Sequence, residues 1–330
     1  MAGSARRSGE VAARFPSLVS GGGYESYYLR AVDPESGRAL WLRHTFHAAG
    51  EGESAVGSIW LTLFGADGGV LATKHSTTDI SPEPSGGWVR VGDSVFGPDG
   101  IEGHCEGARW SLTWSVDDRP LRHLPNELLY RLPLPKTKPE SPMPVVHVSG
   151  EVSIGDTTFV LDGWPGMVGH NWGTQHAERW IWLHGIAFAE RDDAWLDLLV
   201  GRVRVGGKVL PWVAMGTLSL AGERMRLGGF GRRPEVIATP NDLALTVKGA
   251  GGSELTLRAQ SPLDQIIVWR YADPDGSEHQ VANCSACSLE LEFRGRRGEA
   301  VSLTTQYGGT YELGMRETDH GLAVQPFSDP

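Results

Sequence analysis

Two histidines and one glutamate are the side chains of this sequence best suited to move a proton. His170 and His184 belong to the stretch DGWPGMVGHNWGTQHAERWIWLHG, residues 162–185, which holds four tryptophans and three histidines. An imidazole changes its charge near neutral pH, so it can act as a general acid or base. Glu25 stands among three tyrosines in GYESYY, and aromatic surroundings disfavour a charged carboxylate, which lets the acid donate a proton. These residue types suit general acid or base catalysis.

The same residues also have structural interpretations. His170 and Asn171 stand between Gly169 and Gly173, where a bulge or corner would leave backbone groups for the two side chains to satisfy. Glu25 could be a solvated glutamate on an edge strand. The sequence leaves both interpretations open for His170 and for Glu25.

The segment RWIWLHG, residues 179–185, predicts a β-strand with two different faces. Side chains alternate along a strand, so Trp180, Trp182 and His184 share one face, while Ile181 and Leu183 share the other. The second face is typical of a core. The first is either the wall of a ligand cavity, or the filling of a barrel in which His184 bonds a carbonyl group near the mouth.

Metal and nucleotide motifs are incomplete in the sequence. Cys284 and Cys287 form a C-x-x-C pair, but no second pair and no neighbouring histidine motif completes four zinc ligands. His44 and His47 would point to opposite faces of a strand. There is also no P-loop and no nucleophile elbow. The sequence therefore predicts no metal site and no cofactor.

The elements that must position these residues are short antiparallel strands. Alternating segments rich in β-branched or aromatic residues recur along the chain, such as ALWLRHTFH (39–47) and AWLDLLVGRVRV (194–205). Turn signals such as Gly206-Gly207 separate them, and the 44 glycines predict many turns. Only PNELLYRL (125–132) is a good candidate for a helix. Many strands at this spacing predict an all-β sandwich or barrel.

The length of 330 residues favours two domains. The proline-rich stretch RLPLPKTKPESPMP (131–144) is predicted to be a crossover or linker outside any sheet interior, because proline has no N–H for the ladder. We expect one β unit on each side of the central aromatic region, with domains at residues 1–175 and 176–330.

Composition argues against several kinds of partner. With a net charge of −10, the chain has little material for the basic face that nucleic acids or anionic membranes require. The most apolar run, WIWLHGIAFA (180–189), is shorter than the roughly 20 residues of a membrane span. The N-terminus lacks the apolar region of a secretory signal, and three cysteines make no disulfide framework. We therefore predict a cytoplasmic protein with no nucleic-acid partner and no integral membrane association.

Several stretches together resemble the carotenoid hydratase (hydroxyneurosporene synthase) family: SGGGYESYYLRAV, WLRHTFH, VSGEVSIGDTTFVLDG, and GMVGHNWG followed by RWIWLHG. That superfamily of paired lipocalin-like barrels is related to tocopherol cyclases and to lipocalin-like Diels–Alderases. The resemblance is most specific around residues 170–172 and 180–184. It implies two lipocalin-like antiparallel β-barrel or sandwich domains, with a site in or between them for a large lipophilic molecule, isoprenoid- or polyketide-like.

Two functions fit these observations. The first is an enzyme that performs acid/base-assisted hydration or cyclisation of the lipophilic molecule in an aromatic-lined cavity. The second is a carrier or sensor that binds the same kind of ligand unchanged. Convergence of titratable groups in the cavity would distinguish them. The predicted site residues are His170, Glu25 and His184 for proton transfer, and Asn171, Trp172, Trp180, Trp182 and Tyr27 for substrate binding.

Overall fold

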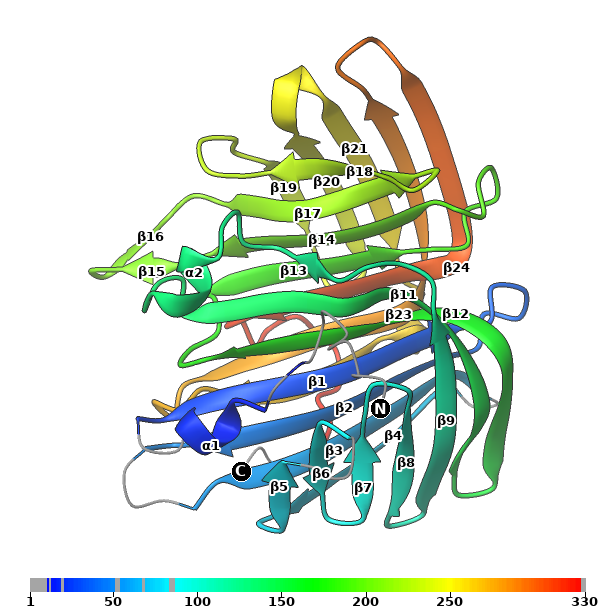
Figure 1. Cartoon of the computed structure of the whole chain (residues 1–330), viewed down its shortest axis with the longest axis vertical. Coiled ribbons are helices and arrows are strands. Elements are labelled where there is room, and N and C mark those ends of the chain that lie inside the picture. Colours follow the sequence, from blue (N-terminus) through cyan, green and yellow to red (C-terminus); the bar gives the residue numbers. More distant parts are fainter. Residues whose placement is uncertain are drawn as a thin grey trace, which may run out of the picture.

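The computed structural model describes residues 11–327, except 12, 19–20, 51–53, 67–68 and 83–86. Within these residues the chain is almost entirely β, with two large antiparallel sheets of twelve and ten strands (Figure 1). Helices are confined to α1 (Phe15–Leu18), α2 (Leu128–Arg131) and two 3-10 turns, η1 (Ala250–Gly252) and η2 (Leu263–Gln265), in the described ranges. The all-β prediction is confirmed. No helix among the described residues is long and apolar enough to cross a membrane.

The N-terminal sheet has the strand order β4-β3-β2-β1-β12-β11-β9-β8-β7-β6-β5, with β10 paired to β11. It curls into a nearly closed barrel in the lower half of Figure 1, where α1 lies beside β1 and β2. Its strands are β1 (Gly23–Val32), β2 (Ala39–Ala48), β3 (Val56–Ala66), β4 (Gly69–Thr77), β5 (Ile80–Pro82), β6 (Val89–Val91), β7 (Ser94–Phe96), β8 (Gly100–Cys105), β9 (Ala108–Val116), β10 (Leu121–Arg122), β11 (Thr137–Ile154) and β12 (Thr157–Gly173).

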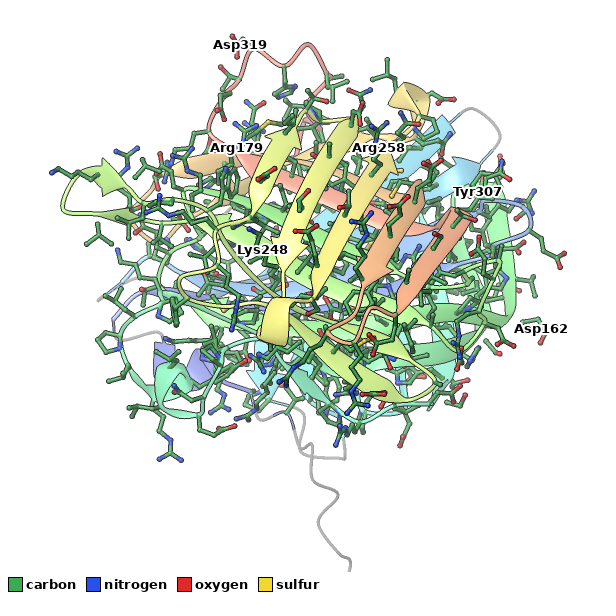
Figure 2. The ribbon with its side chains drawn as sticks, turned by 90° about the horizontal axis from the view of Figure 1, so that it is seen from above. Asp162, Arg179, Lys248, Arg258, Tyr307 and Asp319 are labelled. Atoms are coloured by element: carbon green, nitrogen blue, oxygen red, sulfur yellow. The ribbon has the colours of Figure 1, made fainter. Side chains whose placement is uncertain are left out.

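The C-terminal sheet has the order β18-β17-β14-β13-β24-β23-β21-β20-β19, with β22 paired to β23. It forms a more open half-barrel, and Lys248 and Arg258 lie on the outer side of β20 and β21 (Figure 2). Its strands are β13 (Arg179–Gly185), β14 (Trp195–Arg202), β17 (Val213–Leu220), β18 (Glu223–Gly228), β19 (Glu235–Ala238), β20 (Asp242–Lys248), β21 (Glu254–Gln260), β22 (Ile267–Ala272), β23 (Glu278–Arg294) and β24 (Ala300–Met315); β15 (Arg204–Val205) and β16 (Lys208–Val209) form a separate ribbon.

Each sheet packs one face onto its own hydrophobic core. Leu29 of β1 belongs to the N-terminal core, and Ile181 and Leu183 of β13 belong to the C-terminal core. Because side chains alternate along a strand, the residues between them point to the opposite face. These opposite faces meet between the sheets in a third buried cluster, where the rings of Trp41 and Trp269 lie 6.5 Å apart. The central strands of each sheet therefore contribute to two cores.

The proline-rich stretch is a strand over much of its length, which corrects the prediction of a crossover outside the sheet. β11 begins at Thr137, and it pairs with β12 from there onward, with Glu140 opposite His170. Register shifts occur between Glu140 and Met143 and again after Met143. Pro142 and Pro144 lie at these irregular positions, where the ladder does not need an N–H donor.

Candidate functional site

A cavity of about 860 Å³ lies between the two sheets. This volume falls within the roughly 300–1,000 Å³ range of small-molecule sites. The strand faces that point away from each core form its walls, so the alternation that fills the cores also exposes aromatic side chains to the cavity. Its aromatic lining consists of Tyr24, Tyr28, Trp41, Trp180, Trp182, Phe230 and Tyr271.

Gly169 and Gly173 shape the N-terminal wall of the cavity. Gly169 pairs with Tyr28 across β1 and β12, and a Cβ at Gly169 would lie 2.0 Å from Cζ of Tyr28. The glycine therefore lets the Tyr28 ring lie across the sheet, where it meets the edge of Trp182 with ring centroids 5.1 Å apart. At Gly173 a Cβ would lie 2.0 Å from the carbonyl oxygen of Lys136, so backbone approaches backbone there.

The structure divides the sequence-predicted site residues into two groups. Asn171, Trp180 and Trp182 line the cavity between the sheets. The others do not line this cavity: Glu25, Tyr27, His170, Trp172 and His184. Tyr27 belongs to the N-terminal core, its ring stacked on that of His170 at 4.3 Å. For Glu25, Tyr27, His170 and Trp172 the physical reason is the two-residue period of β1 and β12, which turns alternate residues to opposite faces. His184 shares the face of Trp180 and Trp182, but it lies near the end of β13, against the carbonyl oxygen of Pro144.

His170 bridges two carboxylates on the barrel side of β12. Its Nε2 lies 2.8 Å from Oε1 of Glu25, and its Nδ1 lies 2.9 Å from Oε1 of Glu140. Burial disfavours the imidazolium, but the hydrogen bonds with Glu140 and Glu25 outweigh it and raise the pKa of His170 above its usual value. Burial alone would raise the pKa of Glu140, but bonding to His170 holds it below its usual value. The three residues therefore form a hydrogen-bonded chain.

Glu25 is fully buried, so its interpretation as a solvated edge-strand residue is wrong. It accepts the Tyr27 hydroxyl at 2.7 Å and the backbone N–H groups of Arg14 and Phe15. These bonds attach the segment around α1 to the barrel. Sequence reasoning missed Glu140, because that residue lies in the proline-rich stretch, for which the sequence predicts a crossover or linker.

His184 bonds a backbone carbonyl group, as its structural interpretation predicts. Its Nε2 lies 3.0 Å from the carbonyl oxygen of Pro144, and its Nδ1 lies 3.5 Å from Arg30. Burial, reinforced by the Arg30 charge, lowers the pKa of His184 to about 4. His184 is therefore neutral at pH 7 and suited to holding β13 against β11.

A second acid/base pair, which sequence reasoning missed, borders the cavity. His123 lines the cavity, and its Nε2 lies 3.4 Å from Oδ2 of the fully buried Asp197. Asp197 also accepts the Ser141 hydroxyl at 2.5 Å and the Trp182 indole N–H at 3.3 Å. Nδ1 of His123 has no hydrogen-bond partner among the residues that the structure describes. Nε2 of His123 also lies 3.2 Å from Oγ of Ser141, so Asp197 and Ser141 together orient the imidazole and leave Nδ1 for proton transfer.

The charge of Asp197 is maintained by its neighbours. Burial alone would raise its pKa, but His123, His184 and Ser141 outweigh burial and hold the pKa of Asp197 below its usual value. The sequence carried one signal for this residue: an acid at the centre of the apolar strand WLDLLV (195–200). Buried charges in such a strand need partners. No local pattern indicated that His123 would be the partner.

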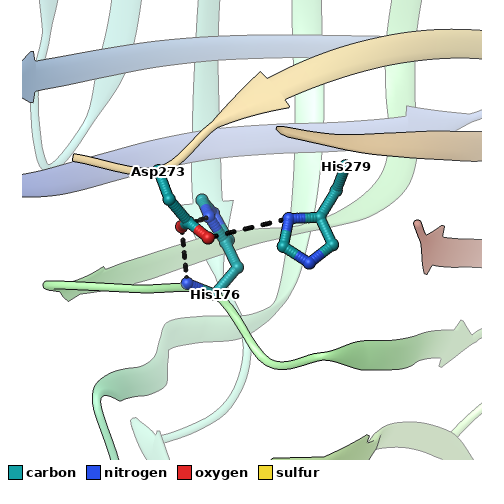
Figure 3. Close-up of side chains that lie close together, drawn as sticks. All are labelled: His176, Asp273 and His279. Carbon is teal, nitrogen blue, oxygen red and sulfur yellow. Dashed lines mark hydrogen bonds and ion pairs between the residues drawn. The ribbon is translucent and has the colours of Figure 1, made fainter. Parts of the chain in front are cut away.

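His176, Asp273 and His279 bring three potential metal ligands together, with their ligand atoms within 4.8 Å of one another (Figure 3). Two imidazoles and a carboxylate are a donor set that zinc and iron accept. Asp273 already accepts both the backbone N–H and Nδ1 of His176 at 2.7 Å, while Nδ1 of His279 lies 3.7 Å from its second oxygen. These bonds attach the connection between the sheets to the turn after β22. Sequence reasoning found no motif here, because the three residues are distant in the chain.

Comparison with known proteins supports the fold of this chain but does not assign it to a family. No family model matches the chain. Two uncharacterized proteins of Mycobacterium tuberculosis, MT0513 (strain CDC 1551 / Oshkosh) and Rv0493c (strain H37Rv), are each 25% identical to it over 307 residues, covering 90% of this chain and 88% of theirs. The structure of CghA is similar with a TM-score of 0.63 at 11% identity, over 89% of this chain and 88% of CghA. Kievitone hydratase from Nectria haematococca gives a TM-score of 0.54 at 11% identity, over 94% and 92%.

The fold is that of paired lipocalin-like barrels. This confirms the predicted architecture, with the N-terminal barrel nearly closed and the C-terminal one half open. Membership of the carotenoid hydratase family in particular stays a prediction.

Proposed function

We propose that this chain is an enzyme that takes a large lipophilic molecule, isoprenoid- or polyketide-like, into the cavity between its sheets and catalyses its acid/base-assisted hydration or cyclisation. One observation carries the proposal: His123, oriented by the buried Asp197, lines the same aromatic-walled cavity as Trp180 and Trp182. A carrier needs apolar walls and one anchor. An oriented imidazole–carboxylate pair is what proton transfer requires.

The solved structures of this fold support ligand chemistry. Kievitone hydratase is a hydratase by name, and CghA has been crystallised with Sch210972. At 11% identity these proteins do not indicate the substrate of this chain. We therefore infer the substrate class from the size and the aromatic lining of the cavity.

In this proposal Nδ1 of His123 exchanges the proton with the ligand, and Asp197 holds the ring and stabilises its charged form. Trp180, Trp182 and Asn171 form part of the wall that binds the apolar body. Proton transfer is assigned to His123 rather than to the predicted His170, Glu25 and His184, because those three do not line the cavity.

The experiment begins with mass spectrometry of the lipophilic molecules that purified protein retains. The retained molecule is then incubated with the protein in D₂O. Hydration or cyclisation with proton transfer to a carbon atom places solvent deuterium on that carbon, so the mass of the product rises. His123→Asn should slow this incorporation by about 10²–10⁴-fold, the usual contribution of a general acid or base, while affinity stays within several-fold.

The matched control is His147→Asn. His147 also pairs with an aspartate, Asp117, at 2.9 Å, but it is partly exposed and does not line the cavity. This control should keep the wild-type rate. A retained ligand that incorporates no deuterium with the wild-type protein, and that binds equally to the His123 variant, would show a carrier or sensor instead.

A further inference from the structure

Arg43 is a buried cation at the wall of the cavity, and no described residue provides its counter-ion. It projects from β2, is only 5% exposed and lines the cavity. Its Nε donates to Oγ of Ser26 at 2.6 Å, and its guanidinium carbon lies 4.1 Å from the centre of the Tyr271 ring. These contacts fix the guanidinium in place. Its Nη1 has no hydrogen-bond partner, and no carboxylate forms an ion pair with it, among the described residues.

Trp41 provides a second free donor beside Arg43. It lies two residues earlier on the same face of β2, with its ring centre 5.8 Å from the guanidinium carbon of Arg43. Trp41 lines the cavity, is 2% exposed, and its Nε1 also lacks a partner in the described part of the chain. An indole N–H and a guanidinium can only donate hydrogen bonds. Two buried, unpaired donors in one wall therefore call for an acceptor from a ligand.

The acidic residues of the cavity wall are engaged elsewhere. Glu312 accepts the indole N–H of Trp180 at 2.9 Å and the amide of Asn283 at 3.2 Å. Glu178 pairs with Arg204 and Arg316. These are the only carboxylates among the described residues that line the cavity, so its wall supplies no anion for Arg43.

Arg30 shows how this fold treats a buried arginine that serves structure. Arg30 is fully buried, and it donates to the carbonyl oxygens of Ser285 and Gly309 at 2.9 and 3.1 Å. Those bonds cross from β1 to the C-terminal sheet and satisfy the guanidinium with backbone acceptors. Arg43 has no such backbone acceptors among the described residues. This difference distinguishes Arg43, which we expect to bind a ligand, from the structural Arg30.

We infer that the cavity binds its lipophilic ligand by an anionic oxygen group, a carboxylate or the enolate or phenolate oxygen of an acidic carbonyl compound, which accepts from Nη1 of Arg43 and Nε1 of Trp41. The inference rests on the proposed function for the apolar body of the ligand. A guanidinium suits such oxygens because its donors match them in geometry and charge. The fixed positive charge also opposes a free carbocation nearby, so it favours a substrate whose oxygen gains negative charge.

The test uses three probes with one apolar body: 1-pyrenebutyric acid, its methyl ester and 1-pyrenebutanol. Binding is followed by energy transfer from tryptophan to pyrene. The wild-type protein should bind the acid at least tenfold more tightly than the ester or the alcohol. Arg43→Met, which keeps the length of the side chain, should reduce this ratio to within twofold. Trp41→Phe should reduce it several-fold, because the ring stays and only the indole N–H is lost.

Arg224→Met is the matched control. Arg224 also lies over a tryptophan, Trp195, but it is paired with Asp118 and lies outside the cavity wall. The acid-to-ester ratio of this variant should equal that of the wild type. The melting temperature of ligand-free Arg43→Met should be equal to or higher than that of the wild type, because an unpaired buried charge has been removed.

The outcomes separate the two proposals. If none of the three probes binds to the wild-type protein, the proposed function of the cavity fails. If all three bind with equal affinity, the lipophilic cavity stands and the anionic group is ruled out. A lower melting temperature for Arg43→Met with an unchanged ratio would make Arg43 structural. Should Arg43→Met fail to fold, an unchanged ratio in Trp41→Phe overturns the inference.

Discussion

Nε2 of His123 lies 3.4 Å from Oδ2 of Asp197, and the two side chains are 2% and 0% exposed. His123 follows β10 of the N-terminal sheet, whereas Asp197 belongs to β14 of the C-terminal sheet. The pair therefore exists only when the two sheets are packed together. His123 also lines the cavity that this packing encloses.

We expect Asp197→Asn to abolish most of the proton transfer. The amide has nearly the same shape, but it cannot stabilise the imidazolium and it favours the wrong tautomer of His123. Deuterium incorporation into the retained ligand should fall by roughly 10²–10⁴-fold with little change in affinity. The control is Asp117→Asn, which alters the exposed pair with His147. Equal rates for the Asp197 and Asp117 variants would remove His123 from the mechanism.

The tryptophans of the central motif should differ in their effect on binding. Trp182 lines the cavity and Trp172 does not, although both are almost fully buried. Trp182→Ala should weaken the binding of a lipophilic probe by at least about tenfold, since it removes aromatic contact area from the wall. Trp172→Ala should leave affinity unchanged while lowering stability. Saturable quenching of tryptophan fluorescence measures both affinities, and the reverse order would place the ligand inside the N-terminal barrel.

The chain of Glu25, His170 and Glu140 should stabilise the fold most between about pH 4.5 and 6.5. Folding raises the pKa of His170, so its contribution is complete below the unfolded value of about 6.5 and is lost as the pH rises through the raised pKa. Folding lowers the pKa of Glu140, so its contribution is present above about 4.5 and is lost as the pH falls through the lowered pKa.

Urea unfolding of the wild type and of His170→Gln between pH 5 and 9 measures how much this chain of residues stabilises the fold. The variant should lose about 3–5 kcal/mol of unfolding free energy near pH 6, because it leaves buried carboxylates unpaired. The loss should shrink as the pH rises through the raised pKa of His170. His147→Gln, at an exposed site, should change stability little at any pH. A loss that is constant from pH 5 to 9 would mean that folding does not raise the pKa of His170.

Local patterns predicted the fold and part of the cavity wall. The two-residue period of RWIWLHG placed Trp180 and Trp182 opposite Ile181 and Leu183, and the structure has the first pair on the cavity and the second in a core. The same local reasoning failed in residues 131–144. Proline has no N–H for the ladder, but β11 accommodates Pro142 and Pro144 at bulges and Pro139 in register opposite Asn171, and these positions depend on the partner strand.

The sequence by itself determined that this protein is all-β, because the alternation of apolar and polar side chains is a property of neighbouring residues and needs no partner to be visible. Only the tertiary structure decided which titratable groups meet. Strand register and the packing of one sheet on the other bring His123 to Asp197, and place Arg43 at the cavity with no counter-ion from the described part of the chain. Those contacts join residues far apart in the chain. No spacing within one segment encodes them, because their free energy arises only when the two sheets bury their shared face.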